Sequence, residues 1–498
     1  MFESAQLGHK VDKVVYKEQE PLLREALLAV QYQLKEQANF PVVILLGGVP
    51  TAGKAETANL LLEWLDPRLI ESHAFGVKSD EELARPAMWR FWRALPPKGK
   101  IALMFGGWYA GPMWDYLQEA YSGQFEHEVE RIARFEKMLA DEGVLLLKFW
   151  LHLPKDELKK RIKKLEADDR TAWRVTEQDR QFLKYYDQIM KAQLAMVMRS
   201  NLADAPWRVI EGSDANYRSL TVGKQVEEAI KHHLERGTPM QKRVEAAPLL
   251  PSIDGLRLLD KLELGSNLSK AEYTKKLEDL QGRLNLLTRH PKFKQMSVTL
   301  VFEGMDAAGK GGSIRRITAA LDARQYRVIP IAAPTEEERA QPYLWRFWRH
   351  VPQHGRMTIF DRSWYGRVLV ERVEGFAARA DWMRAYNEIN DFEAELDAAN
   401  SIVLKFWLAI SKDEQLKRFE EREKIEFKRF KITDEDWRNR DKWDEYIVAA
   451  SDMIDRTNTL SAPWHMIGAN NKYQARISIL EKLCEALESR LQRKDKKR

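Results

Sequence analysis

Short apolar runs alternate with longer amphipathic stretches along this chain, and the alternation predicts strands and helices in turn. Residues 42–46 (VVILL), 101–105 (IALMF) and 144–151 (VLLLKFWL) are continuous apolar runs, which is the pattern of strands buried on both faces. Residues 21–37, before the first run, carry apolar side chains at helical spacing. The alternation predicts an α/β fold in which helices cover both faces of a mostly parallel sheet.

The same order of elements occurs a second time. Residues 298–302 (VTLVF), 357–361 (MTIFD) and 402–408 (IVLKFWL) are again apolar runs, and residues 271–287 precede them with a helical pattern. We therefore expect the chain to contain two copies of one α/β domain.

Matching segments at nearly constant spacing support this duplication. The segment VILLGGVPTAGK, which ends at Lys54, matches TLVFEGMDAAGK, which ends at Lys310, with an offset of 310 − 54 = 256. WRFWR recurs at the same offset, and LKFWL recurs at an offset of 257. We predict domains at residues 1–236 and 266–498, joined by a linker at 237–265 that is rich in proline and charge.

Composition narrows the class of protein. Of 498 residues, 44% are hydrophobic and 31% are charged, as in globular proteins, and the length suits two domains. The 81 basic and 75 acidic residues leave a net charge of only +6, so we expect no nucleic-acid partner. We also expect no membrane partner, because no run of 18 apolar residues occurs. A single cysteine, Cys484, favours a reducing, cytoplasmic location.

The second copy carries a glycine-rich loop between a predicted strand and a predicted helix. In GMDAAGKGG, the residues Gly304, Gly309, Gly311 and Gly312 let backbone N–H groups approach phosphate oxygens, and Lys310 supplies positive charge. A Gly at position 311 replaces the Ser or Thr that commonly binds magnesium in such loops. Any metal must therefore depend on carboxylates.

Two carboxylates are placed for that role. Asp306 lies inside the loop, and Asp361 ends the strand of MTIFDRSWY, followed by Arg362. Because the carboxyl ends of parallel strands meet at one crevice, both acids should face the same phosphates. Two oxygen ligands, completed by waters and phosphate oxygens, suit Mg²⁺.

A basic helical stretch follows the last long strand and could close over the site as a lid. Such a lid would exclude water and stabilise charge during phosphate transfer. An ordinary solvated helix with i,i+4 ion pairs explains many of these residues equally well. The candidate phosphate-binding cations in this lid are Arg418, Arg422, Lys428 and Arg429.

With GMDAAGKGG, DRSWY, LWRFWR and the basic lid, the chain resembles polyphosphate kinase family 2, over nearly its whole length and twice. The tandem form resembles the branch of that family that acts on AMP. The resemblance implies a P-loop kinase core similar to thymidylate kinase, a polyphosphate donor and a nucleotide acceptor. It also implies catalytic roles for Asp306, Lys310, Asp361, Arg362 and Arg422, with magnesium held by the two aspartates.

The two copies differ at these positions. The residues that align with the two acids, with Arg362 and with three of the lid cations of the second copy are uncharged in the first, so we expect the first copy to be catalytically depleted. Asp306, Asp361 and Arg362 align with Pro50, Phe105 and Gly106, and Arg422, Lys428 and Arg429 align with Leu165, Thr171 and Ala172.

The expected reaction is transfer of the terminal phosphate of inorganic polyphosphate to AMP, giving ADP, with GMP and GDP as an alternative pair. An ATP-dependent nucleoside monophosphate kinase would use the same core. A non-catalytic scaffold that binds polyphosphate or nucleic acid is a third reading, but it would gain nothing from carboxylates that face phosphates. The sequence leaves homo-oligomer formation open.

Overall fold

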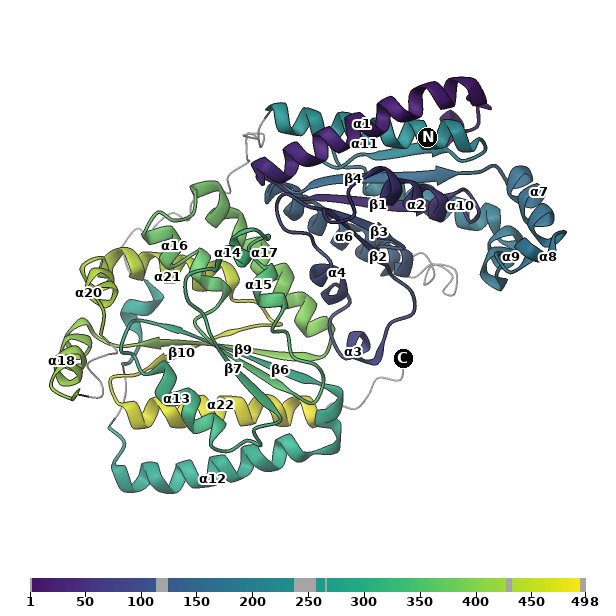
Figure 1. The fold of residues 1–498 in the computed structure, drawn as a ribbon. Coiled ribbons are helices and arrows are strands. Elements are labelled where there is room, and N and C mark those ends of the chain that lie inside the picture. The colour runs from purple at the N-terminus through teal and green to yellow at the C-terminus, as the bar shows by residue number, and fades with distance from the viewer. Residues whose placement is uncertain (1, 113–123, 237–256, 265–266, 427–431, 493–498) are drawn as a thin grey trace. The chain divides into compact units, whose positions relative to one another are not determined.

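The structure, a computed structural model, describes residues 2–112, 124–236, 257–264, 267–426 and 432–492 (Figure 1). The chain divides into two compact units, and each includes a short segment from the other sequence copy. The first unit is Met1–Lys78, Arg90–Gln241 and Pro334–Trp345, and the second is Ser79–Trp89, Lys242–Ala333 and Arg346–Arg498.

The first unit is built on a five-stranded sheet with the strand order β2-β3-β1-β4-β5, and the pairings between these strands are parallel. The predicted apolar runs are its three central strands. The strands are β1 (Val42–Gly48), β2 (Ile70–Ala74), β3 (Ile101–Phe105), β4 (Leu145–His152) and β5 (Trp207–Glu211).

The second unit repeats this topology, with the order β10-β9-β6-β8-β7 and parallel pairing throughout the sheet. The predicted duplication and α/β fold class are confirmed. The strands are β6 (Ser297–Gly304), β7 (Tyr326–Pro330), β8 (Met357–Asp361), β9 (Ser401–Ala409) and β10 (Trp464–Gly468).

Helices flank each sheet. In the first copy they are α1 (Lys13–Gln37), α2 (Lys54–Trp64), α3 (Asp80–Leu83), α4 (Trp89–Arg93), α6 (Gln124–Asp141), α7 (Lys155–Glu166), α8 (Asp169–Ala172), α9 (Glu177–Lys184), α10 (Tyr186–Arg199) and α11 (Ala215–Arg236), after the short 3-10 turn η1 (Glu3–Ala5). In the second copy they are α12 (Lys270–Arg289), α13 (Lys310–Thr318), α14 (Glu336–Arg339), α15 (Trp345–Trp348), α16 (Val370–Val373), α17 (Arg379–Ala398), α18 (Lys412–Glu423), α20 (Asp434–Asp441), α21 (Trp443–Thr457) and α22 (Lys472–Gln492), with 3-10 turns η2 (Leu258–Lys261), η3 (Pro291–Gln295) and η4 (Trp364–Arg367).

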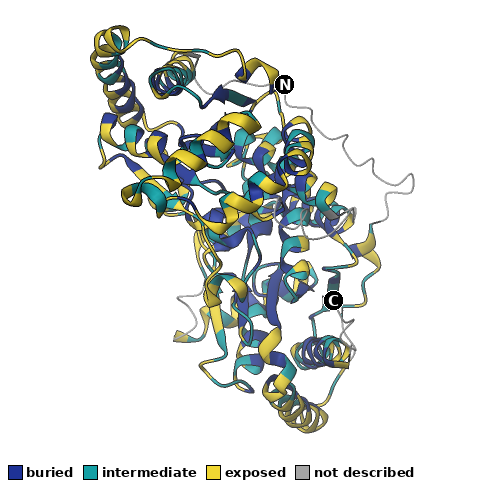
Figure 2. Cartoon of the chain, turned by 90° about the vertical axis from the view of Figure 1, so that its right-hand side faces the viewer, coloured by how far each residue is buried: buried dark blue, intermediate teal, exposed yellow. Residues whose placement is uncertain are grey.

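The helices form layers on the two faces of each sheet. In the second unit α12 and α22 lie side by side with α13 on one face, and α17 packs on the other (Figure 1). In the first unit α1 and α11 are the equivalent neighbours. The sheets are the most buried layers, dark blue in Figure 2, as continuous apolar strands require.

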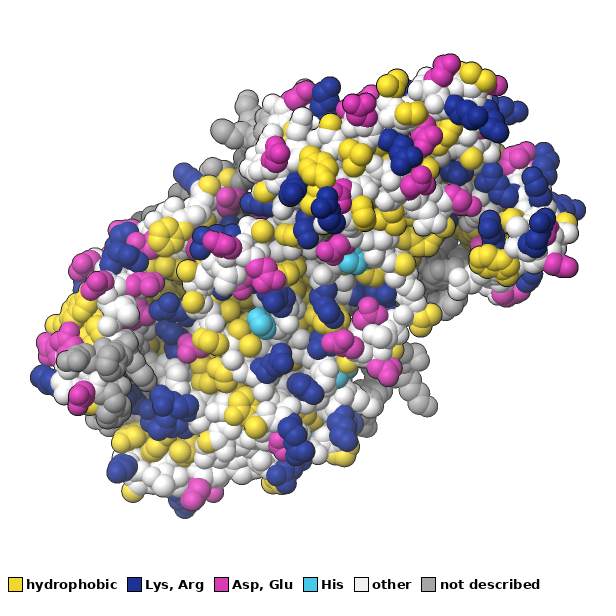
Figure 3. Space-filling view, viewed as in Figure 1, with side chains coloured by type: hydrophobic (Ala, Val, Ile, Leu, Met, Phe, Trp, Pro, Cys, Tyr) yellow, Lys and Arg dark blue, Asp and Glu magenta, His cyan; other side chains and the backbone are white. Residues whose placement is uncertain are grey.

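The surface matches the near-balanced charge. On the face in Figure 3, Lys and Arg side chains are interspersed with Asp and Glu side chains. Within the described residues, no helix combines the length and apolar character that crossing a membrane needs.

Some boundaries differ from the sequence prediction. Helix α1 begins eight residues before Pro21, because the side chain of Asp12 accepts a hydrogen bond from the backbone N–H of Val14 and caps an earlier turn. Most of the predicted linker, residues 237–256 and 265, lies outside the described residues. Its described part contains η2, and the carbonyl of Leu264 accepts a hydrogen bond from the N–H of Asn470 at 2.8 Å, directly after β10.

Candidate active site

The glycine-rich loop of the second unit joins β6 to α13, as the sequence predicts. Gly304 has φ +138°, and a Cβ there would collide with the carbonyl oxygen of Leu408, so only glycine fits. Ala307 and Gly309 are also left-handed, with φ +62° and +111°. These turns lead directly into the first turn of α13, whose N–H groups are free of intrahelical partners and can bind an anion.

Asp361 lies at the end of β8, next to the strand that leads into the loop. Phe302 of β6 and Asp361 are register partners in the sheet. A Cβ built on Gly311 would lie 3.8 Å from Oδ2 of Asp361, so this carboxylate faces the first turn of α13. Glycine at position 311 therefore leaves room beside the carboxylate, where the common loop would have a hydroxyl.

Asp306 is held by two donors in the same place. Arg362 donates from Nη2 to Oδ1 of Asp306 at 2.9 Å, and Asn439 donates from Nδ2 to Oδ2 at 2.9 Å. Burial opposes ionisation of Asp306, but the charges of Lys310 and Arg362 and these hydrogen bonds outweigh it. The pKa of Asp306 lies below its usual value as a result, and the side chain is a carboxylate at neutral pH.

Arg362 adopts a strained backbone to reach Asp306. Its φ is +63°, which is uncommon for a residue with a side chain. The aligned residue of the first copy, Gly106, has φ +66°. The turn is therefore the same in both copies, and the second copy accepts the strain in order to place a guanidinium at Asp306.

A second acid beside the glycine-rich loop, Glu303, is buried. It is the next-to-last residue of β6 and accepts a hydrogen bond from Oγ of Ser363 at 2.7 Å. Burial raises its pKa, in contrast to that of Asp306. Both partners align with glycines in the first copy, Gly47 and Gly107, so the pair occurs only where the catalytic candidates occur.

The candidate lid cations differ in burial and in their contacts. Arg418 is only 2% exposed and donates to the carbonyl oxygens of Ala307 at 2.9 Å and Ala469 at 2.7 Å. A contact between Arg418 and phosphate would require these bonds to break, so the geometry favours support of the loop backbone. Arg422 lies one turn further along α18 and is partly exposed. Lys428 and Arg429 lie outside the described residues.

The first copy shows the same support. Arg161, which aligns with Arg418, donates to the carbonyl oxygen of Thr51 in the first loop at 2.7 Å. Because the first copy retains this contact without counterparts of Asp306 and Asp361, Arg418 and Arg161 fit a folding role better than a catalytic one.

Sequence reasoning missed Asn439 and Tyr446. Asn439 contacts Asp306 across 133 positions of chain, and Oη of Tyr446 donates to Oδ1 of Asn439 at 3.1 Å. A usable signal was nevertheless present. At the offset of 257, these residues align with Phe182 and Ile189, so both polar groups are lost in the copy that lacks Asp306.

The strand-end segment is anchored by a fully buried ion pair between Lys405 and Glu393, with Nζ and Oε2 separated by 2.7 Å. Glu393 also accepts hydrogen bonds from Nε1 of Trp364 and Oη of Tyr365, and Lys405 donates to the carbonyl of Thr457. Trp364 and Tyr365 follow Arg362 after one intervening residue, Ser363. The network therefore fixes the segment that carries Asp361 and Arg362.

Replacing Lys405 with methionine is expected to lower the free energy of unfolding by about 3–5 kcal/mol, because Glu393 would stay buried without its cation. Urea denaturation followed by tryptophan fluorescence measures this loss. Lys148→Met is the matched comparison in the first unit, because Lys148 forms the same kind of buried pair with Glu136 at 2.6 Å. A loss below about 1 kcal/mol, the scale of exposed pairs, would contradict the structural role.

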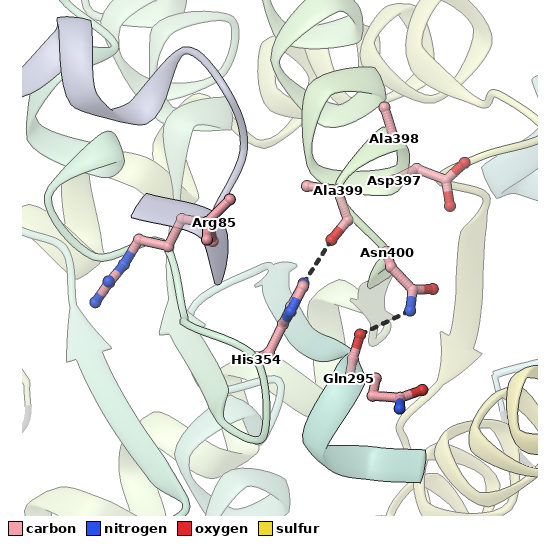
Figure 4. A pocket seen from close by; sticks show the side chains of 8 residues that line it. Arg85, Gln295, His354, Asp397, Ala398, Ala399 and Asn400 are labelled. Atoms are coloured by element: carbon pink, nitrogen blue, oxygen red, sulfur yellow. Dashed lines mark hydrogen bonds between the residues drawn. The ribbon is translucent and has the colours of Figure 1, made fainter. Parts of the chain in front are cut away.

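A separate polar pocket of about 500 Å³ lies in the second unit at the opposite ends of the strands (Figure 4). Its lining residues Gln295, His354 and Asn400 precede β6, β8 and β9, whereas Asp306 and Asp361 follow or end strands. His354 and Ala399 share a hydrogen bond, as do Asn400 and Gln295, so these groups already have partners. The phosphate-loop end is therefore the better candidate for chemistry.

The side chains near the loop offer oxygen ligands to a metal ion. In the part of the chain that the structure describes, no three His, Cys, Asp or Glu side chains gather into a metal cluster. Two carboxylates beside a phosphate loop fit magnesium, which keeps waters and phosphate oxygens in its shell.

Comparison with known proteins agrees with this geometry. A family model described as polyphosphate kinase 2 matches residues 10–237 and again 267–496. A polyphosphate:AMP phosphotransferase of Pseudomonas aeruginosa is 52% identical over 98% of this chain and 99% of its own. A protein of the same name from Pseudomonas syringae pv. tomato is 50% identical over the full length of both chains.

A solved structure gives the same result. A crystal structure described as polyphosphate kinase 2 from Pseudomonas aeruginosa PA01 superposes with a TM-score of 0.90, at 49% identity, covering 99% of this chain and 100% of that one. With two family matches that together span nearly the whole sequence, this chain belongs to the polyphosphate kinase 2 family.

Proposed function

We propose that the second unit transfers the terminal phosphate of inorganic polyphosphate to AMP and releases ADP, with magnesium as cofactor. The observation that carries the proposal is the convergence of Asp306, Asp361, Arg362 and Lys310 on one phosphate loop. The names of the full-length relatives support the choice of substrates.

The reaction needs positioning and charge neutralisation, with no covalent enzyme intermediate. An oxygen of the AMP phosphate attacks the terminal phosphorus of polyphosphate. One phosphoanhydride bond of the polymer breaks as the new one forms, and the shortened chain leaves with the bridging oxygen. Because both substrates are polyanions, their repulsion is the main barrier to the in-line approach.

The residues of the loop divide this work. Loop N–H groups and Lys310 bind phosphate oxygens, and Arg362 stabilises charge beside Asp306. Asp306 and Asp361 would hold magnesium, which supplies further neutralisation of the phosphates when bound. Arg422 on α18 would stabilise the transferred group when the lid covers it and excludes water.

The first unit is proposed to lack transfer activity. Its loop keeps Lys54, Gly48 and Gly53, but Pro50 and Phe105 stand where the two carboxylates would be. Neither side chain offers a ligand to a metal ion.

A cytoplasmic location is also proposed, supported by the single cysteine, Cys484, which is buried.

Purified protein with magnesium, polyphosphate and AMP is expected to form ADP in the absence of ATP, as resolved by ion-exchange chromatography. Parallel reactions replace AMP with GMP, and polyphosphate with ATP, to rank acceptors and donors. If AMP is phosphorylated only when ATP is the donor, the chain is an ordinary nucleoside monophosphate kinase and the proposed donor is wrong.

A further inference from the structure

The side chain of Asn439 reaches the phosphate loop from α20. The helix begins after Thr433, whose backbone N–H and hydroxyl both donate to the carboxylate of Asp436. One turn later the amide of Asn439, in a residue only 9% exposed, donates to Oδ2 of Asp306. Helix α20 thus contacts the carboxylate of Asp306 through one defined hydrogen bond.

Tyr446 fixes the direction of that bond. It lies on α21, is 8% exposed, and donates from its hydroxyl to Oδ1 of Asn439. An amide oxygen only accepts and an amide nitrogen only donates, so the tyrosine bond turns Nδ2 toward Asp306. The series of hydrogen bonds therefore runs from Tyr446 to Asn439 to Asp306. It ends at the carboxylate, which accepts hydrogen bonds and donates none.

An ion-pair cluster holds α20 in place independently of the loop. Glu374, directly after α16, is largely buried, and its Oε2 lies 3.1 Å from Nζ of Lys442 and 3.3 Å from Nε of Arg438. Both cations flank Asn439 in sequence. Asn439 is therefore carried by a helix that ion pairs to Glu374 hold in place.

The first copy lost this arrangement as a set. Pro50, Phe182 and Ile189 align with Asp306, Asn439 and Tyr446, and Phe182 and Ile189 belong to the buried apolar core of the first unit. The fold of the domain is thus compatible with an apolar version of this contact. The second unit instead has polar side chains at all three positions. Apolar residues at the same three positions would leave no hydrogen-bonding group unpaired.

We propose that Asn439 is a positioning residue that fixes the rotamer of Asp306, and that Tyr446 sets the orientation of the Asn439 amide. With Oδ1 bound to Arg362 and Oδ2 bound to Asn439, the remaining lone pairs of the carboxylate keep one direction. Asp306 does not then have to reorient when metal and substrate enter. This inference rests on the proposed role of Asp306 as a magnesium ligand.

The test uses the full-length protein and Mn²⁺ as a spectroscopic substitute for Mg²⁺. Asn439→Leu keeps the approximate shape but removes the donor, and Tyr446→Phe removes only the hydroxyl. We expect Asn439→Leu to weaken Mn²⁺ binding, measured by electron paramagnetic resonance, by about 10–100-fold, the usual cost of losing an outer partner of a metal ligand. Tyr446→Phe should weaken it less, and both should raise the magnesium concentration that half-saturates the rate.

Thr433→Ala is the control, because it removes the N-cap hydroxyl of the same helix and leaves the amide of Asn439 intact. It should leave the Mn²⁺ affinity unchanged. Equal weakening by Thr433→Ala and Asn439→Leu would mean that only helix stability matters, and would overturn the proposal. Unchanged affinity in Asn439→Leu would do the same.

Asp306→Asn separates this inference from the function on which it rests. Loss of Mn²⁺ binding in Asp306→Asn, together with normal binding in Asn439→Leu, removes only the positioning role. Normal binding in Asp306→Asn removes the metal role of Asp306 and the positioning role with it. ADP formation from polyphosphate is measured separately, so the reaction itself stands or falls on its own assay.

Discussion

Lys310→Ala is expected to lower the rate of ADP formation by about 10²–10⁴-fold, the range for losing a fixed cationic stabiliser of phosphoryl transfer, whereas Lys54→Ala should change it less than about twofold. Both lysines occupy the same place in equivalent loops. Nζ of Lys310 donates to the carbonyl of Gly304 at 2.6 Å, and Nζ of Lys54 donates to that of Gly48 at 2.9 Å.

This equivalence makes the two variants a matched pair. Each removes one ammonium group from carbonyl oxygens of a glycine-rich loop, so the structural cost should be similar. The chemical surroundings differ, because the charges of Lys310 and Arg362 act on Asp306, whereas the loop of Lys54 contains Pro50 and the neighbouring strand β3 ends in Phe105. Burial lowers the pKa of Lys54 to about 8, so a fraction of this side chain is uncharged near neutral pH.

Initial rates at saturating AMP and polyphosphate measure the effect, with melting temperatures as a check that both variants fold. A further check is Lys54→Ala combined with Lys310→Ala, which should match Lys310→Ala alone. A loss in Lys54→Ala comparable to that in Lys310→Ala would mean that the first unit takes part in transfer, and the proposed depletion of that copy would be wrong.

The sequence predicted the fold because the fold depends on local patterns. Continuous apolar runs mark β1, β3, β4 and their counterparts β6, β8 and β9, and the structure places all six in parallel sheets. The nearly constant offset between the copies, 256 and then 257, allowed each element predicted in one copy to be predicted in the other. Strand β7, whose residues are either exposed or half-buried, has no continuous apolar run and was not predicted.

The parts of the site that depend on distant contacts were not predictable in this way. The bond between Asn439 and Asp306 requires α20 to lie across the loop, and no local pattern encodes that placement. Arg418 reads as one more lid cation in sequence, yet its guanidinium is buried against carbonyl groups. Comparing the copies position by position does separate the two cases: Arg418 is retained as Arg161, whereas Asn439 becomes Phe182.

The assignment of two short segments to compact units also depends on contacts between residues that are distant in sequence. Ser79–Trp89 is assigned to the second unit and Pro334–Trp345 to the first, although each lies within the other copy in sequence. The two segments align at the offset of 256 and both contain a capping box, at Ser79 and Thr335. Their local structure was therefore recoverable from sequence, but the unit to which each one packs was not.

Asp361→Asn is expected to lower the rate by about 10²–10³-fold while leaving stability nearly unchanged, because it removes a charge needed only when phosphates and metal are bound. Among the described residues the carboxylate of Asp361 has no hydrogen-bond or ion-pair partner, so no native contact is lost. Asparagine also keeps the size of the side chain beside Gly311.

Asp306 does not offer so clean a test, since Asp306→Asn would also leave Arg362 without its ion-pair partner. For Asp361→Asn, rates are measured across a range of magnesium concentrations, and the melting temperature is compared with that of the unsubstituted protein. We expect a higher half-saturating magnesium concentration together with a lower maximal rate, because a neutral amide is a weaker ligand than a carboxylate. A normal rate in Asp361→Asn, or an undiminished rate of the unsubstituted protein in EDTA, would show that Asp361 and magnesium are not part of the transfer step.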